Sequence, residues 1–179
     1  EPGVEITVPK GGDKKKLLEL SERNVNYFID DIRQKERLNL QERNADKLRL
    51  LEQLQVDLQL PALPVQIECF DNSNFHGSFP VSAMVTFKNG EPNKKDYRHF
   101  NIRSVEGIND FASMKETVFR RYKRLIAEDQ SLPQLVIIDG GKGQLNAAVE
   151  ALEELNAKGK MVVIGLAKNE EEIFFPGDQ

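Results

Sequence analysis

Leu135-Val136-Ile137-Ile138-Asp139-Gly140-Gly141-Lys142-Gly143-Gln144 is the stretch of this chain that decides its fold. It opens with four apolar residues, three of them β-branched, which predict a buried strand. Helical periodicity follows over residues 145–155. A carboxylate, Asp139, therefore ends a buried strand above a glycine-rich loop, and open α/β sheets place their sites at that edge.

The composition is typical of a soluble globular protein. The 179 residues leave room for one domain with an appendage, and 39% are hydrophobic against 30% charged. The opening Glu1-Pro2-Gly3 has no Met and no signal peptide, which predicts a fragment or a processed product. No apolar run is long enough to span a bilayer, and the single cysteine, Cys69, fits a reducing compartment. We therefore expect a cytoplasmic protein with no membrane partner.

The first 60 residues are predicted to form a lead-in segment. Alternating apolar residues over 1–12 predict a short extended piece, ended by Pro9 and two glycines. Residues 14–58 contain neither Gly nor Pro and carry Leu at helical spacing. They predict one very long helix, or two helices with a break near residues 38–44. Two prolines, Pro61 and Pro64, then mark the boundary to a second part.

The second part, residues 65–179, is predicted to be an α/β domain of the ribonuclease H-like class. Its predicted elements are strands at 65–70, 81–87 and 96–102, a helix over 109–128 with Phe111 among its buried residues, the strand and helix of the opening stretch, and strands at 161–166 and 172–175. Three antiparallel strands followed by parallel strands joined through helices form a mixed sheet of that class.

Two aspartates are predicted to meet at one edge of this sheet. Asp71 follows the first strand of the domain, and a right-handed crossover returns the chain so that the strand of Asp139 lies beside it. Neighbouring strands are about 4.8 Å apart. Paired carboxylates at that spacing suit a divalent metal and metal-assisted phosphodiester hydrolysis. Each aspartate also has a plainer interpretation, as a turn former or a helix cap.

Other residues near this edge have open roles. The glycine loop matches neither G-x-x-x-x-G-K-[ST] nor G-x-G-x-x-G, but a phosphate at the helix N-terminus with Lys142 as counter-charge stays reasonable. His76 lies in the loop after Asp71, and Glu116 lies one turn into the first helix. With a net charge of −4, DNA contact needs a local patch, and Arg120–Arg124 either line a backbone groove or form a solvated face.

Several motifs together resemble the C-terminal half of the UvrC family, the incision subunit of the bacterial nucleotide excision repair nuclease. The resemblance covers about the last 115 residues closely. It rests on Ile67-Glu68-Cys69-Phe70-Asp71 with Gly77, Tyr97-Arg98 with Phe100, Ala112-Ser113-Met114-Lys115-Glu116 with Arg120-Arg121-Tyr122, Ile138 to Leu145, and Gly165-Leu166-Ala167-Lys168 with Glu172-Ile173.

The resemblance implies an endonuclease domain that makes the 5′ incision beside a lesion, with Mg²⁺ or Mn²⁺ as cofactor. The implied partners are damaged double-stranded DNA and the UvrB–DNA complex, although the family's UvrB-binding segment is absent from this chain. The family's two catalytic and metal-binding aspartates match Asp71 and Asp139, and its catalytic histidine lies beyond Gln179. We therefore expect little incision activity from this chain alone. Asn72-Ser73-Asn74 departs from the Ile-Ser-His that commonly follows the first aspartate.

Further site residues are expected around the two aspartates. The expected accessory residues are Glu116, His76, Lys142 and Gln144, and the expected DNA-backbone contacts are Lys142, Arg120, Arg121 and Lys168. Two other interpretations stay open at this point. One is a ribonuclease H-like scaffold for protein or DNA interaction in which the aspartates are incidental. The other is an α/β domain that binds a phosphate or nucleotide through the glycine loop.

Overall fold

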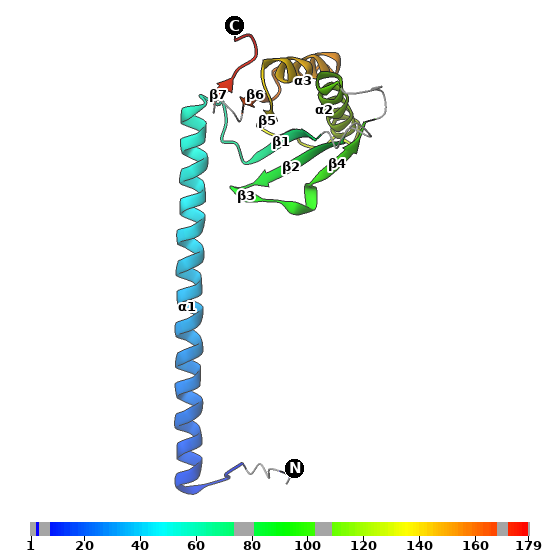
Figure 1. The fold of residues 1–179 in the computed structure, drawn as a ribbon. Coiled ribbons are helices and arrows are strands. Elements are labelled where there is room, and N and C mark those ends of the chain that lie inside the picture. Colours follow the sequence, from blue (N-terminus) through cyan, green and yellow to red (C-terminus); the bar gives the residue numbers. More distant parts are fainter. Residues whose placement is uncertain (1–2, 4–7, 74–80, 103–108, 168–171, 179) are drawn as a thin grey trace. The chain divides into compact units, whose positions relative to one another are not determined.

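The structure, a computed structural model, describes residues 3, 8–73, 81–102, 109–167 and 172–178 (Figure 1). Within them it contains α1 (Gly12–Asp57), β1 (Gln66–Ser73), β2 (Val81–Lys88), β3 (Glu91–Pro92), a short 3-10 helix (Lys94–Asp96), β4 (Arg98–Asn101), α2 (Asp110–Ala127), β5 (Leu135–Asp139), α3 (Lys142–Glu154), β6 (Val162–Ala167) and β7 (Glu172–Phe174). None of the helices in this described part is long and apolar enough to cross a membrane.

The chain divides into two compact units, Glu1–Asp46 and Lys47–Gln179. In the first unit, α1 runs without interruption across residues 38–44, so the predicted break is absent and the single-helix alternative is confirmed. The predicted extended piece falls mostly on residues outside the described ranges. The division lies inside α1, earlier than the boundary predicted from the prolines, and that domain boundary stays a prediction.

The second unit is built on one mixed sheet, as predicted. Its strand order is β3-β2-β1-β5-β6-β7, and β4 also pairs with β2. β1, β5 and β6 are parallel neighbours, whereas β2, β3, β4 and β7 pair antiparallel. The chain passes from the antiparallel strands to β5 through α2, and from β5 to β6 through α3. This is the ribonuclease H-like mixed arrangement expected from the order of elements.

The antiparallel half differs from the prediction in detail. The predicted third strand over 96–102 is shorter, because Lys94–Asp96 form a 3-10 helix and only Arg98–Asn101 are extended. The chain turns at Asn89 and Gly90, which both have positive φ, 52° and 77°, as a two-residue hairpin turn requires. The residues after this turn pair with the end of β2, and β4 pairs with the beginning of β2.

The two faces of the sheet carry separate apolar clusters. On one face α2 and α3 lie side by side (Figure 1), and Met114, Val118, Tyr122 and Leu125 of α2 are buried there. The other face packs against the last turns of α1 and the segment after it. That second cluster comprises Leu51, Leu58, Leu60, Ile67, Leu135 and Ile164.

Phe111 is a correction to the predicted core. Its side chain is 56% exposed, although it stands at helical spacing before Met114 and Val118. It lies in the first turn of α2, and its ring rests on Gly143 of α3 rather than on the sheet. Helical periodicity predicts which face a residue occupies, but it does not say whether a partner covers the end of that face.

Candidate active site at the carboxyl ends of β1 and β5

Asp71 and Asp139 are direct cross-strand partners. They occupy equivalent positions in the parallel pairing of β1 with β5. Directly paired residues on adjacent strands project from the same face of a sheet, here about 4.8 Å apart at the backbone. The sequence prediction that these two residues meet at one sheet edge is therefore confirmed by the strand register. β1 continues to Ser73, however, so Asp71 does not end its strand.

The carboxylates lie on the face opposite to α2 and α3. Their neighbours Phe70 and Ile138 point into the helix-covered core, so Asp71 and Asp139 point the other way. On that face they follow Cys69 and Ile137, which are only partly buried. The terminal turns of α1 pack nearer the start of the strands, around Ile67. The aspartates therefore stand on the less covered part of this face.

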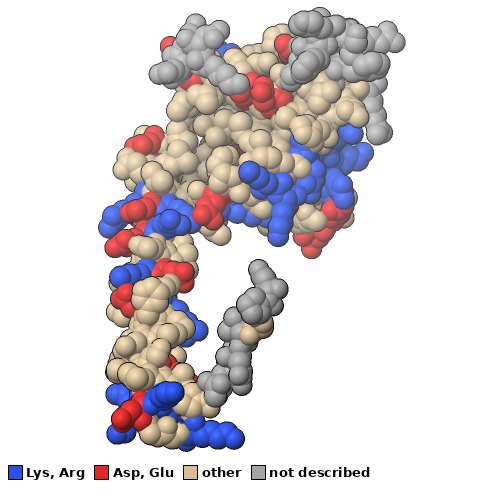
Figure 2. Space-filling view, turned by 60° about the horizontal axis from the view of Figure 1, so that its bottom comes forward, with Lys and Arg blue, Asp and Glu red and all other residues tan. Residues whose placement is uncertain are grey.

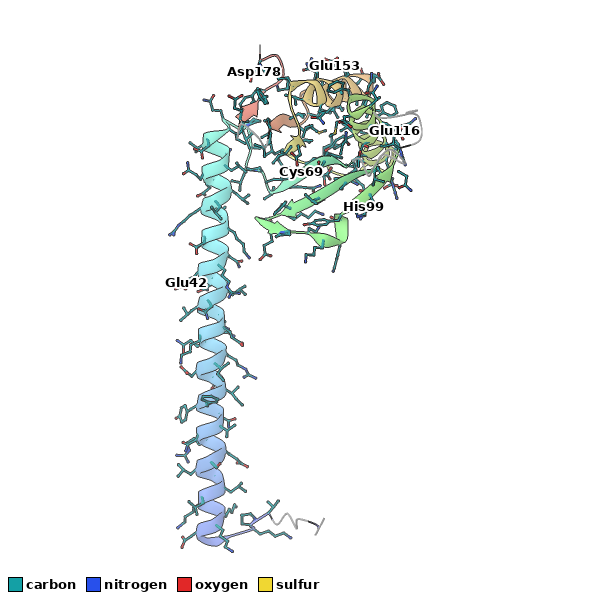
Figure 3. The ribbon with its side chains drawn as sticks, viewed as in Figure 1. Glu42, Cys69, His99, Glu116, Glu153 and Asp178 are labelled. Atoms are coloured by element: carbon teal, nitrogen blue, oxygen red, sulfur yellow. The ribbon has the colours of Figure 1, made fainter. Side chains whose placement is uncertain are left out.

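A row of residues runs across the sheet through the two aspartates. Asp71 pairs with Ala83 of β2, which pairs in turn with the exposed His99 of β4. On the other side, Asp139 pairs with Leu166 of β6. Figure 3 shows His99 on β4 and Cys69 on β1. The small Ala83 is the only residue of this row between His99 and the aspartate pair.

The glycine loop after Asp139 is filled by the protein itself. The Gly141 N–H donates to Gln144 Oε1 at 3.0 Å, and the backbone N–H of Gln144 donates to the Gly141 carbonyl at 3.1 Å. A Cβ on Gly140 would lie 1.7 Å from Gln144 Oε1, and one on Gly143 would lie 2.4 Å from Phe111 Cε1. Only Gly141 has open space beside it. Gln144 thus closes the N-terminus of α3.

The structure gives contacts within the protein for two of the expected accessory residues and for one expected DNA-backbone contact. Lys142 is exposed, and its Nζ lies 5.4 Å from the centroid of the Phe174 ring. Arg120 donates to Glu116 Oε1 at 2.9 Å and to the Asn101 carbonyl at 2.8 Å. Figure 3 shows Glu116 on α2.

The described residues contain no group of three or more His, Cys, Asp or Glu arranged to hold a metal ion. Glu116 therefore does not join the aspartates as a third ligand in this structure. His76 and Lys168 lie outside the described residues.

Arg121 forms a largely buried ion pair with Glu68. Its Nη2 donates to Glu68 Oε1 at 2.5 Å and its Nε donates to Oε2 at 3.2 Å. The hydroxyl of Tyr122 donates to Glu68 Oε2 at 3.1 Å, and the Glu68 side chain has no exposed surface. Only 13% of the Arg121 side chain is exposed and its guanidinium is engaged by Glu68, so Arg121 is not carried forward as a DNA contact.

This cluster shifts the ionisation of its members. Burial raises the pKa of the Tyr122 hydroxyl well above its usual value, and the adjacent Glu68 carboxylate raises it further. Burial alone would lower the pKa of Arg121, but Glu68 outweighs it and the pKa is raised. Sequence reasoning missed the cluster. The available signal was Glu68 itself, a charged residue inside an otherwise buried strand, which requires a partner.

Asn72 fastens α2 to the strand of Asp71. Its Nδ2 donates to the Asp110 carbonyl at 2.8 Å, and its Oδ1 accepts from the Ser82 hydroxyl. Asn109, whose side chain accepts from the Ala112 N–H at 3.0 Å, caps the same helix. The departure from the expected sequence after Asp71 therefore has a structural role here.

Two hollows flank Phe111 at the N-terminal turns of α2 and α3. One has a volume of about 660 Å³ and is lined by Asn109, Asp110, Phe111, Gly141, Gly143 and Gln144. The other, of about 330 Å³, shares Asn109, Phe111 and Gly143 and adds Lys115, Asn146 and Glu150 among its lining residues. The ring of Phe111 thus stands between them.

Basic side chains gather on one part of the second unit, as Figure 2 shows. A polar hollow of about 280 Å³ there is lined in part by Lys88, Asp96, Arg98 and Arg121. Lys88 pairs with Asp96 at 2.7 Å and holds the pKa of that carboxyl below its usual value. The Arg98 guanidinium donates to the carbonyls of Lys95 and Tyr97. Lys88 and Arg121 are therefore paired with carboxylates inside the protein, whereas Arg98 keeps its charge and is held only by carbonyl groups.

Comparison with known proteins gives matches over most of the chain. A "UvrABC system protein C" from Flavobacterium johnsoniae is 54% identical over 175 residues, which is 98% of this chain and 29% of that protein. One from Porphyromonas gingivalis is 52% identical over 176 residues, with the same shares. The chain thus spans about 29% of the length of these curated relatives.

Among solved structures, human ENDOV matches with a TM-score of 0.43 and 15% identity, over 68% of this chain and 59% of that chain. Ciona intestinalis Endonuclease V in complex with DNA containing an inosine matches with a TM-score of 0.40 and 19% identity, over 57% and 46%. The model of the UvrC RNAse H endonuclease domain matches residues 55–179. The chain therefore belongs to the UvrC RNase H endonuclease domain family.

Proposed function

We propose that this chain supplies the nuclease centre that makes the 5′ incision beside a lesion in nucleotide excision repair. The observation that carries the proposal is the direct pairing of Asp71 with Asp139 on one face of the sheet. Family membership supports it, because the matched family is an endonuclease domain. The proposed substrate is damaged double-stranded DNA, presented in a complex with UvrB.

The donor chemistry of the pair fits a hard divalent cation. Asp71 and Asp139 would hold Mg²⁺ or Mn²⁺ between them, since such ions prefer carboxylate oxygens. An ion bound there lowers the pKa of a bound water and offsets negative charge on the phosphoryl oxygens. Lys142 and Arg120 remain the proposed contacts for the DNA backbone among the described residues. Proposed roles for His76 and Lys168 rest on the sequence alone.

The proposal is tested by ion binding, because the sequence predicts little cleavage by this chain alone. Mn²⁺ is titrated into the protein, and free Mn²⁺ is measured by its electron paramagnetic resonance signal. Asp71→Asn and Asp139→Asn should each weaken binding by more than about tenfold, since even an outer-shell ligand partner is typically worth that much. The matched control is Asp129→Asn, at an exposed turn position after α2. Unchanged binding in both site variants would overturn the proposal.

The glycine-loop alternative has less support. Gln144 and Phe111 occupy the space beside Gly140 and Gly143 that a phosphate would need. The same variants separate the alternatives: nucleotide binding that survives both Asp71→Asn and Asp139→Asn would favour a phosphate-binding loop. An interaction scaffold with incidental aspartates would bind DNA equally well in both variants and show no dependence on Mn²⁺.

A further inference from the structure

Phe111 is the large apolar residue of α2 that the core leaves out. The buried stripe of this helix begins at Met114, which has no exposed surface, whereas Phe111 is 56% exposed. Single exposed apolar residues are common on protein surfaces and mean little alone. Phe111 differs because its ring has a defined seat and a hollow on each side.

The seat of the ring is the backbone of α3. Cε1 and Cζ of Phe111 would lie 2.4 Å and 2.8 Å from a Cβ on Gly143, so only glycine allows the ring to lie there. The helix that carries Phe111 is held at its start by the Asn72–Asp110 hydrogen bond and by the Asn109 cap. A ring held in this way loses little conformational freedom when it binds a ligand.

The ring stands near the chain segments that continue from both aspartates, although the carboxylates themselves point from the sheet face opposite to α2 and α3. Asp110, next to Phe111 in the chain, accepts a hydrogen bond from Asn72, and Asn72 follows Asp71 directly. Gly143, beneath the ring, follows Asp139 by one short loop. The ring is therefore anchored to the continuations of both strands that carry the proposed metal ligands.

The chemistry of the larger hollow excludes a phosphate as its preferred occupant. Its lining contains no Lys or Arg and one carboxylate, Asp110. One N–H at each helix start, of the kind that commonly holds an anion, is already used inside the protein: the Ala112 N–H donates to Asn109 and the Gly141 N–H donates to Gln144. What remains is an aromatic face with amide groups at its border. That combination fits an uncharged, planar group with polar edges.

We propose that Phe111 is a stacking platform for one nucleobase of the DNA strand whose phosphate is held at Asp71 and Asp139. The inference rests on the proposed function, because the strand reaches the ring only if it is bound at the aspartates. Aromatic rings hold bases through their π faces largely without regard to sequence. The platform therefore positions the strand and does not read its sequence.

The test uses the absence of tryptophan from this chain. Phe111→Trp places a single fluorophore at the platform, and Phe28→Trp places one at the exposed Phe28 of α1 as the matched control. Each protein is titrated with a DNA oligonucleotide in the presence of Mg²⁺, and binding is followed separately by the fluorescence anisotropy of labelled DNA. Stacking should quench the emission at position 111 and leave that at position 28 unchanged.

Affinity provides the second measurement. Phe111→Ala should weaken DNA binding by roughly 5- to 150-fold, the range for losing one stacked base. Phe111→Leu keeps an apolar side chain without a flat face and should weaken binding nearly as much. Circular dichroism checks that each variant is folded. If Phe111→Ala does not fold, Phe111→Leu and Phe111→Trp still test the proposal.

Three outcomes would overturn the inference. The first is DNA binding, seen in the anisotropy of labelled DNA, without quenching of the tryptophan emission at position 111. That result would rule out the platform and leave the proposed function intact. Emission at position 111 that is blue-shifted and shielded from acrylamide before DNA is added would mean that protein covers the ring. Absence of DNA binding by the unchanged chain, together with Mn²⁺ binding indifferent to Asp71→Asn and Asp139→Asn, would remove the proposed function and the platform with it.

Discussion

At the scale of single residues, Glu68 is the position where the surroundings matter most. A carboxylate with no exposed surface is tolerated because Arg121 and Tyr122 both donate to it. The cluster lies on the helix-covered face of β1, three residues before Asp71 on the opposite face. It therefore stabilises the strand that carries one of the proposed metal ligands without contacting the ligand.

Loss of the Glu68 charge should destabilise the fold. Glu68→Gln leaves the Arg121 guanidinium buried without its counter-ion, which typically costs about 3–5 kcal/mol of unfolding free energy. The measurement is urea denaturation followed by circular dichroism. Glu153→Gln, which removes an exposed ion pair with Lys158, is the matched control and should cost no more than about 1 kcal/mol. Equal losses in the two variants would contradict the role given to the cluster.

The raised pKa of Tyr122 makes the fold sensitive to alkali. A hydroxyl whose pKa is higher in the folded state contributes stability that is fully present below the unfolded pKa, near 10, and is lost as pH rises through the folded pKa. The unfolding free energy of the unchanged protein should therefore fall as pH rises above about 10. Tyr122→Phe should be less stable at neutral pH but should lose stability less steeply in alkali.

Urea denaturation at a series of pH values measures both effects of the Tyr122 substitution. Tyr27→Phe, at an exposed position of α1, should reproduce the alkaline slope of the unchanged protein. If Tyr122→Phe also kept that slope, the titration of Tyr122 would not be the cause.

The sequence predicted the meeting of Asp71 with Asp139 but not the partner of Glu68. Strand order and the handedness of crossovers limit which strands are neighbours, and the two aspartates follow from that rule. Arg121 and Glu68 are 53 residues apart, and their contact depends on which turn of α2 crosses β1. A run of basic residues on a helix does not show, from sequence alone, which of its members points inward.

At the scale of elements, two different residues of the first turn of α3 make two separate contacts. Gln144 closes the helix N-terminus, and Gly143 provides the seat for Phe111. The sequence left a phosphate in the glycine loop as a reasonable interpretation, but Gly140 faces Gln144 and Gly143 faces Phe111. Side-chain packing decides which residues lie beside these glycines, and the backbone preferences of glycine give no information about that packing.

A substitution at Gly143 should separate stability from DNA binding. Gly143→Ala favours the helix by up to about 1 kcal/mol, and Phe111 can swing outward because it is exposed. The unfolding free energy should therefore stay level or rise while DNA affinity falls with the displaced ring. Gly11→Ala, which would also meet nothing within 4 Å and lies outside both hollows, is the control and should keep the affinity. Retained affinity in Gly143→Ala would show that the seat of the ring is not needed.

At the scale of the whole molecule, the prolines and the packing of the core place the boundary between the two parts of the chain at different residues. Pro61 and Pro64 follow the end of α1, as the sequence predicted. The last turns of α1 nevertheless belong to the second compact unit, which begins at Lys47. Hydrophobic spacing in a helix is the same whether its leucines meet a sheet or stay exposed, so the sequence alone could not place this division.

Deleting the end of α1 should therefore damage the domain that carries the aspartates. A fragment of residues 61–179 lacks Leu51, Leu58 and Leu60, which pack on Ile67 and its neighbours. Each buried leucine contributes at most about 1.5–3 kcal/mol, and their loss exposes the sheet face below Asp71 and Asp139. Compared with residues 47–179, the shorter fragment should unfold at lower urea concentration and bind Mn²⁺ more weakly, because a loosened β1–β5 pair no longer holds the carboxylates in register. Equal urea midpoints for the two fragments would contradict this, and equal Mn²⁺ affinity despite a lower midpoint would show that the register survives without its apolar cover.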